Sequence, residues 1–138
     1  MNGSEFFLQF DPPRVTSQMK GINYKTRHVF TKPEVIAAEN LFAEHLEFFK
    51  PTLPSEEPIR LRVEFRFGYS GKSHKDGEWK TTKPDTDNLI KILKDVMTRV
   101  GFWKDDAQIV LETVGKKWSK TPGILISWKE MERWREDA

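Results

Sequence analysis

The chain has 138 residues, 37% of them hydrophobic and 32% charged, which predicts one globular domain over residues 1–138 with a sizeable core. It contains no cysteine, which excludes a disulfide framework and a thiolate zinc site. We expect no membrane span and no secretion leader, because no apolar run is long enough and the N-terminus lacks a basic-then-apolar design. The formal net charge of +2 is mild for a DNA-binding protein, so charge alone does not predict nucleic acid as a partner.

In chain order, the first predicted element is a strand over Glu5–Phe10, in which Phe6, Leu8 and Phe10 share one face. The segment Arg14–His28 then has few apolar residues and several basic ones. Two interpretations of this segment stay open: a solvated loop, or a basic arm that contacts phosphates without reading sequence.

Thr31-Lys32-Pro33-Glu34 predicts the start of a helix, with a capping Thr, an early Pro and a Glu three residues on. Apolar residues at helical spacing extend this helix to about Phe49. A strand over Ile59–Phe67 follows, because apolar and charged residues alternate strictly there. Its three arginines would suit a DNA backbone, although a charged outer face of a sheet is the commoner explanation.

Residues 68–83 form a predicted basic loop, rich in Gly, Ser and Lys, that leads directly into Asp85. A basic loop of this kind could close on a phosphate substrate. Trp79 within it could stack on an exposed base, but a single tryptophan in a loop more often packs on its own domain.

The next predicted helix begins at Asp85 to Asp87 and ends at Gly101, with Asp85 or Asp87 as the candidate cap. Its apolar stripe comprises Leu89, Ile92, Leu93, Val96, Met97 and Val100. Asp105 and Asp106 fall in the turn before a strand over Ala107–Trp118. A return strand over Ile124–Lys129 and a charged tail over 130–138 complete the chain. The order β-α-β-α-β-β predicts an α/β (α+β) fold, a single mixed sheet with two main helices packed on it.

The aspartates form two close pairs, Asp85/Asp87 and Asp105/Asp106. Taken singly, an Asp before a helix is usually a cap and an Asp in a turn is usually part of the turn. The helix between the pairs is only about 21 Å long. The second pair can meet the first only if the turn carries it back across the helix, which periodicity does not establish.

A longer pattern spans both pairs and their helix: P-D-x-D-N-L-x-K over Pro84–Lys91, Asp95, and then G-F-W-x-D-D-A-Q-I over Gly101–Ile109. This pattern resembles the signature of RusA-type Holliday junction resolvases, small endonucleases of bacteria and their phages. A weaker likeness lies in Pro12-Pro13 and Arg27-His28-Val29. The family usually has an Asn soon after the two prolines, where this chain has Val15-Thr16-Ser17.

The resemblance implies a metal-dependent nuclease whose catalytic residues are Asp85, Asp87, Asp106 and Lys91. It implies that the three aspartates bind Mg²⁺, for which Mn²⁺ can substitute, with Asp105 as an additional candidate ligand. Magnesium suits such a site because it prefers hard oxygen ligands and needs few of them from the protein. An ion pair with Asp87 is the alternative role for Lys91, one helical turn away.

The resemblance also implies the partners: branched DNA, above all the four-way junction, and a second copy of the chain in a homodimer that makes two symmetric nicks. The expected location is the bacterial cytoplasm, near the nucleoid, in a bacterium or prophage. The candidate DNA-binding residues are Arg14, Lys20, Lys25, Arg27, Lys72, Lys75, Lys80 and Lys83. Two alternatives remain: a nuclease acting on forks or flaps, and a junction-binding module without cleavage.

Overall fold

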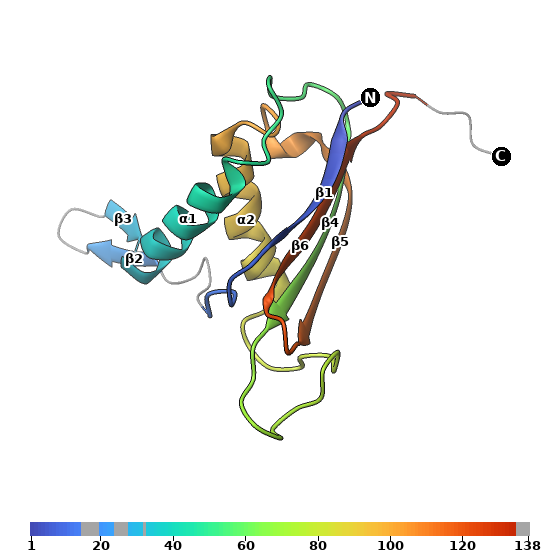
Figure 1. The fold of residues 1–138 in the computed structure, drawn as a ribbon. Helices are drawn as coiled ribbons and strands as arrows, with labels where there is room; N and C mark the ends of the chain where they lie inside the picture. Colours follow the sequence, from blue (N-terminus) through green and yellow to red (C-terminus); the bar gives the residue numbers. More distant parts are fainter. Residues whose placement is uncertain (15–19, 24–27, 32, 135–138) are drawn as a thin grey trace.

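The computed structural model describes residues 1–14, 20–23, 28–31 and 33–134 (Figure 1). Three strands come first: β1 (Gly3–Leu8), β2 (Lys20–Asn23) and β3 (His28–Thr31). They are followed by helix α1 (Pro33–Leu46), strand β4 (Ile59–Phe67), helix α2 (Thr86–Val100), the 3-10 helix η1 (Asp106–Gln108), and strands β5 (Ile109–Trp118) and β6 (Gly123–Glu130). The predicted fold class, a mixed sheet with two main helices, is confirmed.

The main sheet has four strands in the order β1-β6-β4-β5. Strands β4 and β5 are parallel because the α2 connection returns the chain to the same end of the sheet, whereas β6 pairs antiparallel with both β4 and β1. Helices α1 and α2 both lie on one face of this sheet (Figure 1). The order leaves β5 at one edge, beside α2.

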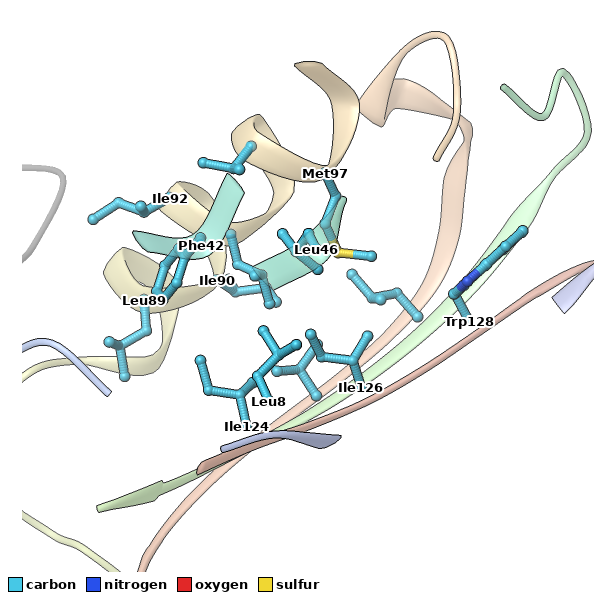
Figure 2. Close-up of a cluster of buried hydrophobic side chains, with 14 of the residues drawn as sticks. Leu8, Phe42, Leu46, Leu89, Ile90, Ile92, Met97, Ile124, Ile126 and Trp128 are labelled. Atoms are coloured by element: carbon cyan, nitrogen blue, oxygen red, sulfur yellow. The ribbon is translucent and has the colours of Figure 1, made fainter. Parts of the chain in front are cut away.

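The core lies between the helices and the inner face of the sheet. In β4 the predicted alternation is confirmed, since Ile59, Leu61, Val63, Phe65 and Phe67 are at most 3% exposed. Figure 2 shows side chains of the two helices pointing toward those of the sheet. The labelled residues are Phe42, Leu46, Leu89, Ile90, Ile92 and Met97 from the helices, and Leu8, Ile124, Ile126 and Trp128 from the sheet. The apolar stripe of α2 therefore fixes which face of that helix remains polar.

Helix α2 has the predicted bounds, but its N-terminus is not capped as expected. Asp85 occupies the N-cap position, yet its side chain accepts no capping hydrogen bond. At the other end Gly101 adopts a φ of +111°, and its N–H donates to the carbonyl of Met97 at 3.2 Å. Glycine tolerates this left-handed conformation, which ends the helix before Phe102 and Trp103 enter the core.

The structure differs from the sequence-based expectation at several points in the N-terminal half. Strand β1 spans Gly3–Leu8 instead of Glu5–Phe10, and Thr31, the predicted helix cap, is the last residue of β3. Part of the segment predicted as a loop or arm forms a second sheet, in which β2 pairs antiparallel with β3. Helix α1 ends at Leu46, three residues before Phe49, whose ring instead stacks on Phe6 with centroids 4.3 Å apart. No described helix has the length and apolarity needed to cross a bilayer.

Candidate active site

A cleft of about 600 Å³ opens between the polar face of α2 and strand β5. Its lining comprises Thr86, Asp87, Asn88, Ile90, Lys91, Lys94, Asp95, Asp106, Glu112 and Val114. Three of the four residues predicted to be catalytic therefore share one cavity: Asp87, Lys91 and Asp106. Asp87 and Asp106 come from different segments, so the fold unites them in a way that the spacing of the sequence did not establish.

The acids are spread along the cleft, because β5 runs opposite to α2. Lys116, near the end of β5, donates to the carbonyl of Pro84 just before α2, at 2.8 Å. Lys94, in the second half of α2, pairs with Glu112, near the start of β5, at 2.9 Å. This direction places Asp106, which precedes β5, toward the C-terminal half of the helix. In the described residues, no three acidic, His or Cys side chains gather closely enough to hold a metal ion.

Asp85 lies outside the lining of the cleft, at the N-cap of α2 two residues before Asp87. The backbone before it is held by two lysines. The ammonium of Lys80 donates to the hydroxyl of Thr82 at 2.6 Å and to the carbonyl of Lys83 at 2.8 Å. Lys116 donates to the carbonyl of Thr82 at 2.5 Å as well as to that of Pro84. The peptide bond between Lys83 and Pro84 is cis.

Asp105 and Asp106 are neighbours with different surroundings. The carboxylate of Asp105 accepts a hydrogen bond from the N–H of Ala107 at 2.9 Å and so caps η1. Gln108 completes this capping box: its side-chain oxygen accepts from the N–H of Asp105, and its side-chain nitrogen donates to the carbonyls of Ser55 and Glu57. Asp106 is exposed and lines the cleft. The turn thus uses one aspartate to fix its own shape and presents the other.

The structure adds Lys94 and Glu112 to the predicted site. It also shows that Asp95, which the sequence analysis named only as part of the longer pattern, lines the cleft. Lys91, Lys94 and Asp95 follow Asp87 by four, seven and eight residues, which is the spacing of one helical face. The signal was therefore present in the sequence, on the face opposite the apolar stripe. Glu112 gave no such signal, because only the register of β5 beside α2 brings it to the cleft.

The residues predicted to bind DNA have diverse environments. Lys72, Lys75 and Lys83 are exposed, and Arg14 donates to Asp11 at 3.3 Å and to the carbonyl of Gly68 at 3.0 Å. Lys25 and Arg27 lie outside the described residues, as does the side chain of Lys20.

Lys80 is 5% exposed and has an internal role instead of a surface one. Its ammonium lies 4.3 Å from the ring centroid of Trp118 and 5.2 Å from that of Phe67. Burial, together with the positive charges of Lys116 and Arg14, lowers the pKa of the Lys80 ammonium.

Comparison with known proteins identifies the family of the chain. Residues 11–128 match the family described as endodeoxyribonuclease RusA. The chain is 35% identical over 108 residues to the crossover junction endodeoxyribonuclease RusA of Lactococcus phage r1t, an alignment that covers 77% of this chain and 82% of the relative. It is also 39% identical over 51 residues to the uncharacterized protein YqaN of Bacillus subtilis (strain 168), covering 37% and 35% of the two chains. The chain therefore belongs to the RusA family of endodeoxyribonucleases.

Proposed function

We propose that this protein is a divalent-metal-dependent endonuclease that resolves four-way DNA junctions by paired symmetric nicks. The observation that carries the proposal is that Asp87, Lys91 and Asp106 line the same open cleft. The name of the phage relative, a crossover junction endodeoxyribonuclease, supports the choice of a four-way junction as the substrate.

The donors in and beside the cleft suit Mg²⁺ in kind, since carboxylate oxygens are its preferred protein ligands and one or two of them suffice beside a phosphate. Asp87 and Asp85, two residues apart at the start of α2, are the ligands that we propose first, with Asp106 as the third. A bound divalent ion would lower the pKa of its water and offset charge on the phosphate. Lys91, one helical turn beyond Asp87, would hold the scissile phosphate through its exposed ammonium.

The distribution of the acids along the cleft supports a homodimer. Strand β5 is an edge strand, and Val110 and Leu111 on it are 58% and 53% exposed. Such an edge pairs readily with another strand. The end of this edge is already taken, because Trp79 bridges Lys117, so the part open to a second copy is residues 109–115. Antiparallel pairing of two such segments would direct Asp106 of one copy toward the end of β5 and the start of α2 in the other, where Asp85 and Asp87 lie. Two copies would then complete two sites related by a two-fold axis.

This dimer has a direct test in the double variant Val110→Lys/Leu111→Lys, which places charges on the edge strand. We expect it to be monomeric by light scattering while the wild type is dimeric, and to lose nicking. The matched control is Phe48→Lys/Leu53→Lys, because those side chains are also exposed, at 87% and 75%, but lie away from β5. A monomeric wild type, or a control that dissociates as readily as the β5 variant, would contradict the proposed dimer.

The test of the function is cleavage of a synthetic four-way junction with Mg²⁺, run beside a fork, a flap and a linear duplex of matched length. We expect paired nicks in the junction and none in the linear duplex. Asp87→Asn should abolish nicking and still bind the junction, because neutralising an acid does not weaken contact with phosphate. Preferred cutting of the fork or flap would favour the alternative branched substrate. Junction binding with no nicking by the wild type would favour a non-catalytic module.

A further inference from the structure

The second face of the sheet carries a groove that the proposed mechanism does not use. Helices α1 and α2 cover only one face, and no described helix covers the other (Figure 1). A groove of about 450 Å³ crosses this open face over all four strands. Its lining includes Glu5, Arg62, Trp79, Thr113, Leu125 and Ser127. Strand β5 separates this groove from the cleft with Asp87 and Asp106, and Val114 borders both.

Trp79 stands over this groove with most of its indole in water. The side chain is 66% exposed, yet its backbone is fixed, because Trp79 forms an antiparallel bridge to Lys117 of β5. The neighbouring hydrogen bonds, Trp118 N–H to Glu78 and Lys80 N–H to Lys116, hold it from both sides. The ring lies over Gly115, with its Cζ3 atom 3.7 Å from the position that a Cβ would occupy there, and the ammonium of Lys117 is 5.6 Å from the ring centroid. An exposed indole on a rigid backbone is a ready stacking surface.

Basic side chains outnumber acidic ones on this face. Register places Arg60, Arg62 and Arg66 of β4 beside Lys117 of β5, against Glu5 and Glu64. Glu64 is already paired with Arg66 and Lys117, at 2.8 Å and 3.2 Å, and Arg60 donates to the hydroxyl of Ser127 at 3.0 Å. Arg62 is exposed and makes no hydrogen bond or ion pair with any described residue. Its guanidinium therefore remains available for an anion.

From these observations we propose that the open sheet face binds single-stranded DNA, with a base stacked on Trp79 and a phosphate held by Arg62. A basic groove with an exposed aromatic ring is the arrangement that binds single strands, whereas a duplex keeps the faces of its bases covered. The basic excess makes this face repel a second copy of itself, which argues against a dimer interface here. The inference rests on DNA being the substrate and adds a surface for the unpaired strand of a branched molecule.

The test measures binding of a labelled oligothymidylate by fluorescence anisotropy, with the full chain and with EDTA present so that no cleavage occurs. Trp79→Leu should weaken binding roughly tenfold, and Trp79→Phe, which keeps an aromatic ring, should retain most of the affinity. Arg62→Gln should reduce the slope of log K against log salt by about 0.7, the value for one phosphate contact on a single strand.

Two matched controls accompany these variants. Trp134 is 74% exposed but lies near Glu57 and Arg133, at the opposite end of the sheet from Trp79, so Trp134→Leu should bind as the wild type does. Arg99→Gln makes the same charge change as Arg62→Gln on the helical side. The proposal would be overturned if Trp79→Leu and Trp134→Leu lost the same affinity for oligothymidylate. It would also be overturned if Trp79→Leu weakened binding of a blunt duplex as much as binding of the single strand. A change of oligomeric state in Trp79→Leu would instead identify an interface between copies and also overturn it.

Each variant is also checked by its melting temperature, which should be unchanged because the replaced side chains are exposed. If Trp79→Leu proves unstable, Trp79→Phe and Arg62→Gln carry the test through affinity and salt slope. The outcome is separable from that of the proposed function. Strand binding that depends on Trp79, without junction nicking, contradicts only the nuclease proposal, whereas nicking with no contribution from Trp79 contradicts only this one.

Discussion

The ammonium of Lys116 lies 2.8 Å from the carbonyl oxygen of Pro84, the residue directly before Asp85. The same ammonium bonds the carbonyl of Thr82, and Lys80 bonds that of Lys83. The carbonyls of all three residues from 82 to 84 are thus held by two lysines. The entry into α2, and with it the position of Asp85 and Asp87, depends on cations that do not themselves line the cleft.

Lys116→Met should therefore slow junction nicking while leaving junction affinity near that of the wild type. Loss of the two carbonyl contacts lets the approach to Asp85 shift, and a displacement of about 1 Å at a catalytic group can cost on the order of a hundredfold in rate. Single-turnover rates at saturating junction, set beside dissociation constants, separate positioning from binding. Lys120→Met is the control, because Lys120 is exposed and its side chain bonds to none of the residues that the structure describes, whereas its backbone N–H donates to Asp76. Equal rates in both variants would contradict the positioning role.

Lys80→Met should change how stability depends on pH. Burial and the charges of Lys116 and Arg14 lower the pKa of Lys80 below its usual 10.5, so between the lowered value and 10.5 the unfolded chain binds more protons than the folded chain. Stability of the wild type therefore rises with pH in that window. Urea unfolding at about pH 7 and about pH 10 measures this. Between these two pH values, the free energy of unfolding of the wild type should rise relative to that of Lys80→Met. If the wild type and Lys80→Met differ in free energy of unfolding by the same amount at both pH values, the lowered pKa of Lys80 is contradicted.

The sequence predicted the elements that local patterns determine and missed what depends on their pairing. Strict alternation gave β4 its bounds, and the apolar stripe with Gly101 gave those of α2. The pairing of β2 with β3 was missed because those short strands lack an alternating pattern. Lys80 was predicted to contact DNA from a basic loop, but nothing local signals that Phe67 and Trp118 enclose it. The place of Glu112 in the cleft likewise follows from the register of β5.

Asp105 and Asp106 should respond differently to the same substitution. Asn is as good a cap as Asp, so Asp105→Asn should keep the capping bond to Ala107 and most of the activity. Asp105→Ala should lower the free energy of unfolding by about 1 kcal/mol. Asp106→Asn should leave stability unchanged but reduce nicking by about a hundredfold or more, since ligands of a catalytic ion contribute several kcal/mol. Nicking by Asp106→Asn at the rate of Asp105→Asn would remove Asp106 from the proposed site.

Glu64 holds two of the cations on the open sheet face, so its removal should alter both stability in acid and DNA binding. Burial raises the pKa of its carboxyl. The hydrogen bonds from Arg66 and Lys117 together lower that pKa by more than burial raises it, so the net pKa lies below the usual 4.5. The stability that Glu64 contributes is therefore present above pH 4.5 and is lost as the pH falls through its folded-state value. In acid unfolding experiments, Glu64→Gln should not show this loss of stability as the pH falls.

The same substitution should release Arg66 and Lys117 to contact phosphate. We expect Glu64→Gln to bind oligothymidylate more tightly, with a salt slope steeper by about 0.7 for each phosphate gained. Glu39→Gln is the matched control, because Glu39 also pairs with a cation, Arg99 at 3.5 Å, but on the helical side. Tighter binding in both variants would mean that net charge alone is responsible, and tighter binding in neither would mean that the strand does not cross this face.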